Sequence, residues 1–325
     1  MPMRPSFLSS AKAAGALGCW LLVLSCNNAA EEKVQVNTAS AGFPDEIVQF
    51  TAFEGNPVFT GAGKDAWDEE IRERGFILKE SDGYHLWYTG YRKDKPDTLF
   101  LGYASSNDGI HWQRYPGNPV YKNAWTEDMM VIKDSNVYYM FAEGRGDTAH
   151  MLSSIDKIHW EERGPLKILT AKGGPLSPGP YGTPTVVKTD TSWYLFYERN
   201  DSAIWLASSK DLETWKNVRD EPILKKGPDA YDRFGVAMNQ VLFYKGNYYG
   251  YYHGTAFADW SEWSTNVAVS SDLIHWTKYQ GNPILKENKS SGILVDDGNQ
   301  YRLYSMHPQV CLHFPARTPP GSIKK

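Results

Sequence analysis

The sequence predicts an all-β protein, a five-bladed β-propeller in which each blade is a four-stranded antiparallel sheet. Three observations support this fold class. A turn motif ending in tryptophan occurs four times, and a strand motif rich in aromatic residues occurs five times in alternation with it. A further strand pattern near the N-terminus has no partner within its own unit and supplies the strand that the last unit lacks.

The turn motif is a Ser-Ser pair followed by a tryptophan. Its copies cover residues 105–112, 153–160, 208–215 and 270–276. In three copies a proline follows the tryptophan by seven positions, at Pro119, Pro222 and Pro283. The four tryptophans are separated by 48 to 61 residues, a period that suits a unit of four short strands.

The strand motif begins at five equivalent anchor positions, which are Tyr84, Tyr138, Trp193, Tyr248 and Tyr301. Each copy alternates in polarity and follows a turn, and a β-rich stretch precedes that turn, as expected for a hairpin. One unit therefore contains four strands, and five copies predict five blades.

The two ends of the predicted domain complement each other. The last unit ends near residues 310–314, before a fourth strand. Residues 47–59 form a strand pattern that contains Gly55-Asn-Pro-Val58, a near copy of segments 117–120 and 281–284. Pairing the two ends completes the fifth blade and removes free sheet edges. We therefore expect the N-terminal strand to close the ring, and we expect no separate helical domain.

The first 26 residues have the composition of an export signal. Arg4 and Lys12 accompany an apolar run that is too short to span a bilayer. The run ends in Val23-Leu24-Ser25-Cys26, which resembles a bacterial lipobox. We therefore expect residues 1–26 to be a signal peptide whose Cys26 is lipidated, which makes the protein an exported lipoprotein of the periplasm or cell surface. An ordinary cleaved signal peptide is the alternative.

The remaining chain divides into three parts. Residues 27–45 are small and polar and are expected to form a flexible tether. The propeller is expected to cover residues 46–317, and residues 318–325 form a tail. Membrane contact is expected only through the lipid anchor.

Composition excludes several classes of partner and cofactor. The chain has 34 Lys and Arg residues against 38 Asp and Glu residues, a formal net charge of −4, so we expect no nucleic-acid-binding surface. Two of the three cysteines lie in the signal, which leaves Cys311 without a disulfide partner and excludes a cysteine-based metal site. We expect no cofactor and assign no metal ligands, although a structural or axial divalent ion is compatible with the sequence.

The order of motifs in the second unit resembles glycoside hydrolase family 43. Asp128 is followed by Val131-Ile-Lys133, then by Tyr138-Tyr-x-Phe141, and then by Ser154-x-Asp156-x-x-x-Trp160. Families 32, 62, 68, 117 and 130 share the five-bladed fold of family 43. The resemblance implies an enzyme that hydrolyses or phosphorolyses glycosidic bonds in an axial pocket, with oligosaccharides as partners.

Side chains at equivalent positions of a propeller form rings around its axis. Ten residues before the anchors lie Arg74, Asp128, Thr183, Met238 and Ser291, and five residues after them lie Thr89, Glu143, Glu198, His253 and Met306. The resemblance places catalytic carboxylates in the first ring, where Asp128 fits. The second ring combines two carboxylates and an imidazole after aromatic runs. Since burial of an unpaired charge is costly, this combination indicates a functional site.

Glycoside cleavage requires a carboxylic acid that protonates the leaving oxygen and a carboxylate that activates water or attacks directly. We expect Asp128 to act as the general base or as an orienting carboxylate. Either Glu143 or Glu198 is expected to be the acid, and His253 to assist or replace it. The alternative is that the two glutamates are buried partners of arginines that only join the blades, and that His253 is a core residue.

The first and third blades depart from the family pattern. In the first blade, Glu70 or Glu73 is expected to supply the carboxylate, within the charged segment 67–74. In the third blade, Gly182-Thr183-Pro184 replaces the usual acid. Substrate-binding candidates are cations beside the acids, one hydroxyl group, and aromatic rings that stack on sugars; they are Arg72, Arg74, Arg145, Arg199, Thr183, Trp205, Trp260 and Trp263.

These features predict an exo-acting glycoside hydrolase of plant or algal oligosaccharides. Two alternatives remain open. The first is a non-catalytic glycan-binding lipoprotein. The second is a glycoside phosphorylase, which needs a basic phosphate site, and Arg72, Arg74 and Arg145 are the candidates for that site.

Overall fold

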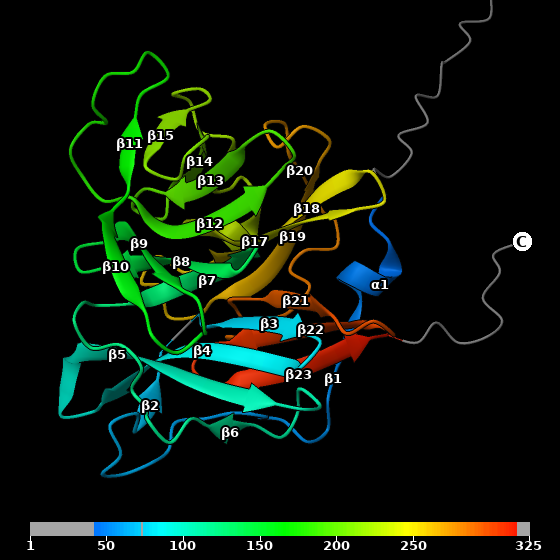
Figure 1. Ribbon diagram of the computed structural model, residues 1–325. Coiled ribbons are helices and arrows are strands. Elements are labelled where there is room, and N and C mark those ends of the chain that lie inside the picture. Colours follow the sequence, from blue (N-terminus) through cyan, green and yellow to red (C-terminus); the bar gives the residue numbers. More distant parts are fainter. Residues whose placement is uncertain (1–41, 73, 317–325) are drawn as a thin grey trace, which may run out of the picture. The chain divides into compact units, whose positions relative to one another are not determined.

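The computed structural model describes residues 42–72 and 74–316, and in this part it confirms the five-bladed β-propeller (Figure 1). The innermost strands of the blades are β3 (Phe76–Glu80), β7 (Glu127–Asp134), β12 (Gly182–Lys188), β17 (Gly235–Tyr244) and β21 (Ile293–Asp296). Each innermost strand contacts the next, and β21 contacts β3, so the ring is closed. Cys26, Glu73, the predicted signal peptide and the predicted tail lie outside the described residues.

The remaining strands continue outward from the innermost ones. Blade one adds β2 (Glu70–Ile71), β4 (Gly83–Arg92), β5 (Lys95–Ser106) and β6 (Gln113–Arg114); blade two adds β8 (Val137–Gly144), β9 (Thr148–Ser154) and β10 (Glu161–Pro165). Blade three adds β11 (Lys167–Leu169), β13 (Trp193–Glu198), β14 (Ala203–Ser209), β15 (Thr214–Asn217) and β16 (Leu224–Lys225). Blade four adds β18 (Asn247–Thr255), β19 (Ser264–Ser270) and β20 (Thr277–Lys278), and blade five adds β22 (Tyr301–Met306), β23 (Val310–Pro315) and β1 (Phe50–Ala52).

Two blades contain more than the four antiparallel strands that the repeat predicts. In blade one, β2 and β3 both pair with β4. In blade three, β11 pairs with β15 in parallel, and β16 adds to β14. The additional strands β2, β11 and β16 are two or three residues long and come from the connections between blades, where the repeat has no fixed spacing.

The fifth blade is closed as the sequence predicts. Strand β1 pairs with β23, and the Leu312 N–H donates to Asn56 Oδ1 at 2.7 Å while Asn56 Nδ2 donates to the Leu312 carbonyl at 2.7 Å. Asn118 and Asn282 form the same two-way bonds with Tyr103 and Val267. The asparagine of each Gly-Asn-Pro segment therefore takes the place of a strand residue at the edge of its blade.

The segment before β1 differs from the prediction in its local structure. Residues 45–48 form a short helix, α1 (Asp45–Val48), rather than the start of a strand. The Phe43 ring lies 4.8 Å from the ring of Tyr279, and the Tyr249 hydroxyl donates to the Gly42 carbonyl. The folded part therefore includes residues 42–45, which the composition assigned to the tether.

The turn tryptophans join neighbouring blades through edge-to-face contacts. Their rings meet the aromatic strand of the preceding blade in four pairs, Trp160 with Trp87, Trp215 with Phe141, Trp276 with Phe196 and Trp112 with Tyr304, at centroid distances of 5.9 to 6.5 Å. Tyr251 is the equivalent ring of blade four, and blade five has no turn tryptophan. The Tyr251 hydroxyl instead donates to the Ile47 carbonyl of α1, so α1 fills the fifth position.

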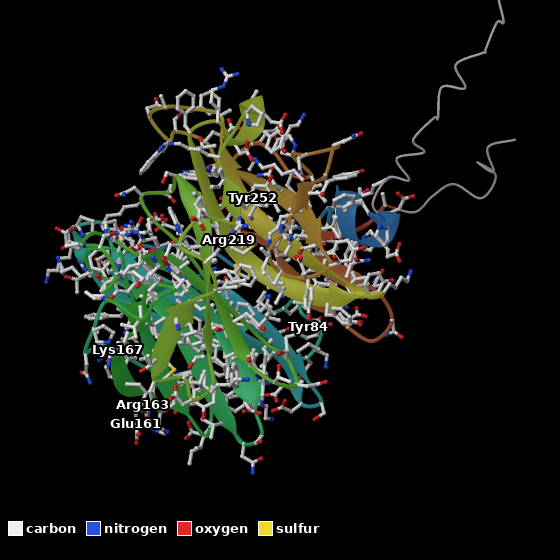
Figure 2. All side chains as sticks on the ribbon, turned by 90° about the horizontal axis from the view of Figure 1, so that it is seen from above. Tyr84, Glu161, Arg163, Lys167, Arg219 and Tyr252 are labelled. Atoms are coloured by element: carbon white, nitrogen blue, oxygen red, sulfur yellow. The ribbon has the colours of Figure 1, made fainter. Side chains whose placement is uncertain are left out.

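The outer strands carry the exposed charge. Glu161 and Arg163 of β10 form an ion pair of 3.3 Å and lie at the periphery in Figure 2.

Within the described ranges, no helix has the length and apolar character required to cross a membrane.

We predict that Trp215→Ala destabilises the propeller by about 3–5 kcal/mol because it leaves a cavity between blades two and three. Trp215 is fully buried, whereas Trp260 is 46% exposed, so Trp260→Ala is the matched control and is expected to change the unfolding free energy little. Chemical denaturation of both variants measures the difference. Equal losses would contradict the proposed contribution of the interblade contact.

Candidate functional site

The candidate site is built by irregularities at one end of the innermost strands. In blade two, Glu127 pairs with Glu143 and Met130 pairs with Phe141, so two residues on β7 oppose one on β8. Blade three repeats the pattern around Gly182 and Glu198. The resulting bulges turn the ring position toward the axis.

The residue ten positions before the anchor has a positive φ in four blades, at Arg74 (28°), Asp128 (45°), Thr183 (43°) and Ser291 (56°). A non-glycine residue in this region costs about 1–2 kcal/mol. In blade four the irregularity falls one residue later, at Asn239, between Met238 and Gln240. The repeated strain shows that the first ring is a structural feature of the propeller.

Glu143 and Glu198 face each other across the boundary between blades two and three. They are 8% and 4% exposed. Gly182 lies between them, because a Cβ at this position would be 2.2 Å from Glu143 Oε2 and 2.8 Å from Glu198 Oε1. Only glycine leaves room for both carboxyl groups. Blade three has no acid at this position. The carboxyl groups of Glu143 and Glu198 fill the space beside Gly182 instead.

Backbone donors orient both carboxyl groups. The Thr183 N–H donates to Glu143 Oε2 at 2.7 Å, with the Thr183 hydroxyl at 3.3 Å from the same oxygen. The Asp201 N–H donates to Glu198 Oε2 at 2.5 Å. Thr183, which the sequence offered as a substrate ligand, thus links blade three to the glutamate of blade two.

Burial dominates the electrostatics of the pair. Burial raises the pKa of Glu143 well above its ordinary value, and the negative charges of Asp128, Glu127 and Glu198 raise it further. Burial also raises the pKa of Glu198 to about 7, with a contribution from Asp147 and Asp128, against the opposing Asp201 N–H. Both glutamates therefore hold a proton at a pH where an ordinary carboxyl group has lost it.

Arg74 lies at the centre of the ring and is fully buried. Its guanidinium donates to Thr185 Oγ1 at 3.0 Å, to the Met238 carbonyl at 3.0 Å and to the Pro184 carbonyl at 2.9 Å. Its Nε lies 3.7 Å from Asp128 Oδ1. Burial lowers the pKa of Arg74 to about 10, while Asp128 and Glu143 oppose that shift. Arg74 therefore joins four blades and balances the charge of Asp128, rather than facing a substrate.

The other predicted arginines have separate positions. Arg72 forms an ion pair with Glu127, and Arg145 donates to the Asp97 carbonyl at 3.1 Å. Arg199 donates to the carbonyls of Ser177, Pro178 and Pro180 at 2.9 to 3.0 Å, which holds this loop against β13.

The arrangement also bears on the hypothesis that the glutamates only join blades. Within residues 42–72 and 74–316, neither Glu143 nor Glu198 forms an ion pair with Arg74, Arg145 or Arg199. The pairing that this hypothesis requires is therefore not found in the described part of the chain.

His253 occupies the fourth-blade position of the second ring and is 8% exposed. Asn239 Nδ2 lies 3.0 Å from its Nδ1, and the Trp263 ring meets the imidazole edge-to-face at 4.8 Å. Trp260 lies 6.0 Å from Trp263 and is 46% exposed. The predicted residues His253, Trp263 and Trp260 thus form an aromatic path from the ring to the surface.

Two predicted residues lie outside this cluster. Glu70 pairs with the exposed Lys93 at 2.6 Å, beside the hairpin of β4 and β5. Trp205 stacks on Tyr197 at 6.2 Å, and its Nε1 donates to the Asp220 carbonyl at 3.0 Å, so one ring face is covered. Glu73 lies outside the described residues.

Sequence reasoning missed several residues of the site. The sequence analysis did not assign Glu127 to the site, but Glu127 is 6% exposed and its charge acts on Glu143. Gly182 and Asn239 were not singled out as components of the cluster. The sequence analysis missed the strand bulge. A strict alternation of side chains along β7 does not account for the extra residue between Glu127 and Met130.

One group of side chains has the donor set of a metal site but is already paired. Glu80, Asp82 and His85 lie together at the other end of β3. The Lys157 ammonium group is 2.8 Å from Glu80 Oε2, 2.8 Å from Asp82 Oδ2 and 3.0 Å from His85 Nε2. The lysine therefore supplies the positive charge that a cation would supply there.

The chain is similar in sequence or fold to proteins that act on glycosides. No protein-family model matches the chain. A 1,2-β-oligomannan phosphorylase of Thermoanaerobacter sp. (strain X514) is 24% identical over 209 residues, which cover 59% of this chain and 67% of that protein. The β-1,2-mannobiose phosphorylase of Listeria innocua, solved with β-1,2-mannobiose, has a TM-score of 0.62 at 15% identity, covering 82% of this chain and 95% of that one.

A second solved structure belongs to glycoside hydrolase family 130, a family of mannoside phosphorylases that contains hydrolases targeting β-1,2-mannosidic linkages in Candida mannan. Its TM-score is 0.68 at 17% identity, and the alignment covers 86% of this chain and 98% of that one. The chain has the fold of glycoside-processing enzymes. The chain is thus similar to members of the five-bladed group that its motifs resemble, at low sequence identity, as the sequence predicted.

We predict that Gly182→Ala lowers the unfolding free energy by about 1–3 kcal/mol, because the new methyl group overlaps the two carboxyl groups. The control is Gly174→Ala, where the added carbon would lie 3.4 Å from Thr170 Oγ1, an ordinary contact. Denaturant titration of both variants measures the effect. A Gly182→Ala variant as stable as Gly174→Ala would show that the carboxyl groups are not held at this position.

Proposed function

We propose that the protein is an exo-acting glycoside hydrolase in which Glu198 is the general acid and Asp128 is the general base. The observation that carries the proposal is the pair of buried carboxyl groups, Glu143 and Glu198, that meet across Gly182 beside the Arg74–Asp128 ion pair. Glycosidases require carboxyl groups in two protonation states, and neighbouring environments of this kind separate them.

The protonation states support the two roles. A pKa of about 7 lets Glu198 carry a proton at neutral pH and still release it to a leaving oxygen. Asp128 is balanced by Arg74 and is assigned the ionised role. The proposed reaction breaks the bond between the anomeric carbon and the leaving oxygen. Glu198 protonates that oxygen, Asp128 takes a proton from water, and the water oxygen bonds to the anomeric carbon with inversion. Glu143, which holds its own proton, is assigned to substrate positioning.

The aromatic path on blade four supports sugar binding. Trp263 and Trp260 present flat rings beside His253, and apolar faces of sugar rings stack on such surfaces. The mannoside specificity of the relatives makes β-1,2-linked manno-oligosaccharides the first substrates to test, ahead of plant and algal oligosaccharides. The export signal and lipobox expected from the sequence are consistent with the proposed role.

Hydrolysis is favoured over phosphorolysis by the positions of the cations. Arg74 is fully buried and donates to protein carbonyls, and Arg72 pairs with Glu127. Arg145, the third arginine considered for a phosphate site, is exposed and donates to the Asp97 carbonyl, so the three arginines do not converge on one anion site in the described part of the chain.

The first experiment is an oligosaccharide screen with and without added phosphate, with the product anomer determined by NMR. We expect turnover that does not depend on phosphate, with an inverted anomer. Glu198→Gln is expected to lower kcat by at least about 100-fold, and Glu221→Gln, at an exposed glutamate, is the matched control. A Glu198→Gln variant that retains full turnover would refute the assignment of the acid.

We predict that kcat/KM falls as the pH rises through about 7, because Glu198 then loses its proton. The free energy of unfolding is also expected to fall as the pH rises. Folding raises the pKa of Glu198 from 4.5 to about 7, so the protein loses stability between these two pH values. Thermal unfolding at about pH 5 and about pH 8 measures this loss, which is expected to be smaller in Glu198→Gln. An equal loss in both proteins would contradict the raised pKa.

A non-catalytic glycan-binding lipoprotein remains the second candidate, carried by the same aromatic path. Wild-type protein that binds an oligosaccharide without cleaving it would favour this candidate. Retained binding in Glu143→Gln and Glu198→Gln with lost turnover favours the enzyme.

A further inference from the structure

A cavity of about 680 Å³ lies between blades one and two, beside the acid cluster rather than on the axis. Its volume is in the range of small-ligand pockets. The side chains that matter for the argument are Phe100, Lys122, Trp125, Arg145, His150 and Glu162. None of the residue assignments made from the sequence placed a binding site here, apart from Arg145.

Trp125 supplies a flat wall of the cavity. The Arg145 guanidinium lies 4.8 Å from the centre of its ring, and the Arg72 guanidinium lies 5.9 Å from it. Within the described part of the chain, the buried indole Nε1 of Trp125 has no hydrogen-bond acceptor. The two guanidinium groups therefore hold the Trp125 ring, and its indole N–H is buried without an acceptor among the described residues.

The cavity also contains a built polar pair. His150 is 5% exposed, and its Nδ1 lies 2.9 Å from Glu162 Oε1. Glu162 accepts a further bond from the Tyr121 hydroxyl at 2.9 Å, which holds the carboxylate in place. His150 Nε2 is buried without a partner among residues 42–72 and 74–316. A buried nitrogen in this state favours a ligand that supplies the missing bond.

Two residues that line the cavity lie close in the sequence to the acid cluster. Gly144 lines the cavity and directly follows Glu143 on β8. Trp125 is separated by one residue from Glu127, and Arg72 contacts both the Trp125 ring and the Glu127 carboxylate. A group bound against Trp125 therefore lies near the Glu127 carboxylate of the acid cluster, with Arg72 between them.

The lining favours a neutral sugar over an anion. Arg145, Lys122 and His150 offer donors, while Asp97 and Glu162 place acceptors and negative charge in the same wall. Vicinal hydroxyl groups both donate and accept, and a sugar ring also has an apolar face for Trp125. The two acids offset the charges of Lys122 and Arg145, so the wall has no excess of positive charge that would favour a phosphate or carboxylate ligand.

We propose that this cavity is the subsite for the leaving-group sugar of a neutral oligosaccharide, with Trp125 as the stacking surface and Arg145 and His150 as polar ligands. The inference rests on the proposed hydrolase function. It places the leaving sugar between blades one and two, and the sugar that is released by water lies on the side of His253 and Trp263.

The test compares two substrates with the same glycosyl group. One is β-1,2-mannobiose, or the disaccharide that the screen shows to be cleaved best, and the other is the corresponding glycosyl fluoride, which has no leaving sugar. Trp125→Ala is expected to lower the ratio of the two kcat/KM values, disaccharide over fluoride, about tenfold, a change of about 1.4 kcal/mol. The control is Phe243→Ala, at an exposed ring of blade four that is 61% accessible, which is expected to leave the ratio unchanged.

Binding provides an independent readout if no substrate is turned over. Calorimetric titration of wild-type, Trp125→Ala and Phe243→Ala proteins with β-1,2-mannobiose, cellobiose and xylobiose is expected to show binding that only Trp125→Ala weakens. That result without turnover would reject the hydrolase and retain the sugar site. An unchanged ratio in Trp125→Ala with normal turnover would reject the subsite and retain the hydrolase, and absence of binding to every sugar would also reject the subsite.

Discussion

Contact between the turn tryptophan of one blade and the aromatic strand of the blade before it is the interaction on which the propeller depends. Each blade buries one face against a neighbour, and the four edge-to-face pairs set the relation between successive sheets. The fifth pair is missing because the last blade has no turn tryptophan. Helix α1 takes its place through Ile47 and Tyr251, and β1 completes the blade beside it. The N-terminal segment therefore contributes both strand pairing and core packing to closure.

A closed ring brings charges together that are distant in the sequence. Arg74 spans from blade one to carbonyl groups of blades three and four and to Asp128 of blade two. A buried guanidinium is stable only with acceptors on every side, and bulged innermost strands turn their carbonyls toward it. The same bulges place Thr183 and Gly182 against Glu143 and Glu198. The bulges that bind Arg74 therefore also position the carboxyl groups of the proposed reaction.

Particular residues show how much of the site could be predicted from the sequence. The anchor alignment placed Asp128, Glu143, Glu198 and His253 in common rings. In the strand register, Glu143, Glu198 and His253 lie opposite the equivalent residues Glu127, Gly182 and Ala237 of their innermost strands. The alignment could not distinguish Arg74, which the fold buries, from Arg72 and Arg145, because burial depends on neighbouring blades. Trp205 and Glu70 are residue types expected in a sugar-binding site. In the structure, however, Trp205 stacks on Tyr197, and Glu70 forms an ion pair with Lys93.

The sequence by itself determined the fold class, the number of blades and the pairing of the two ends, because these follow from a repeated pattern of apolar and turn residues. The tertiary structure alone decided which charges are paired, which carboxyl groups keep a proton, and where a cavity opens beside them. Protonation depends on desolvation and on charges from other blades. Those distances exist only after five sheets have closed around one axis.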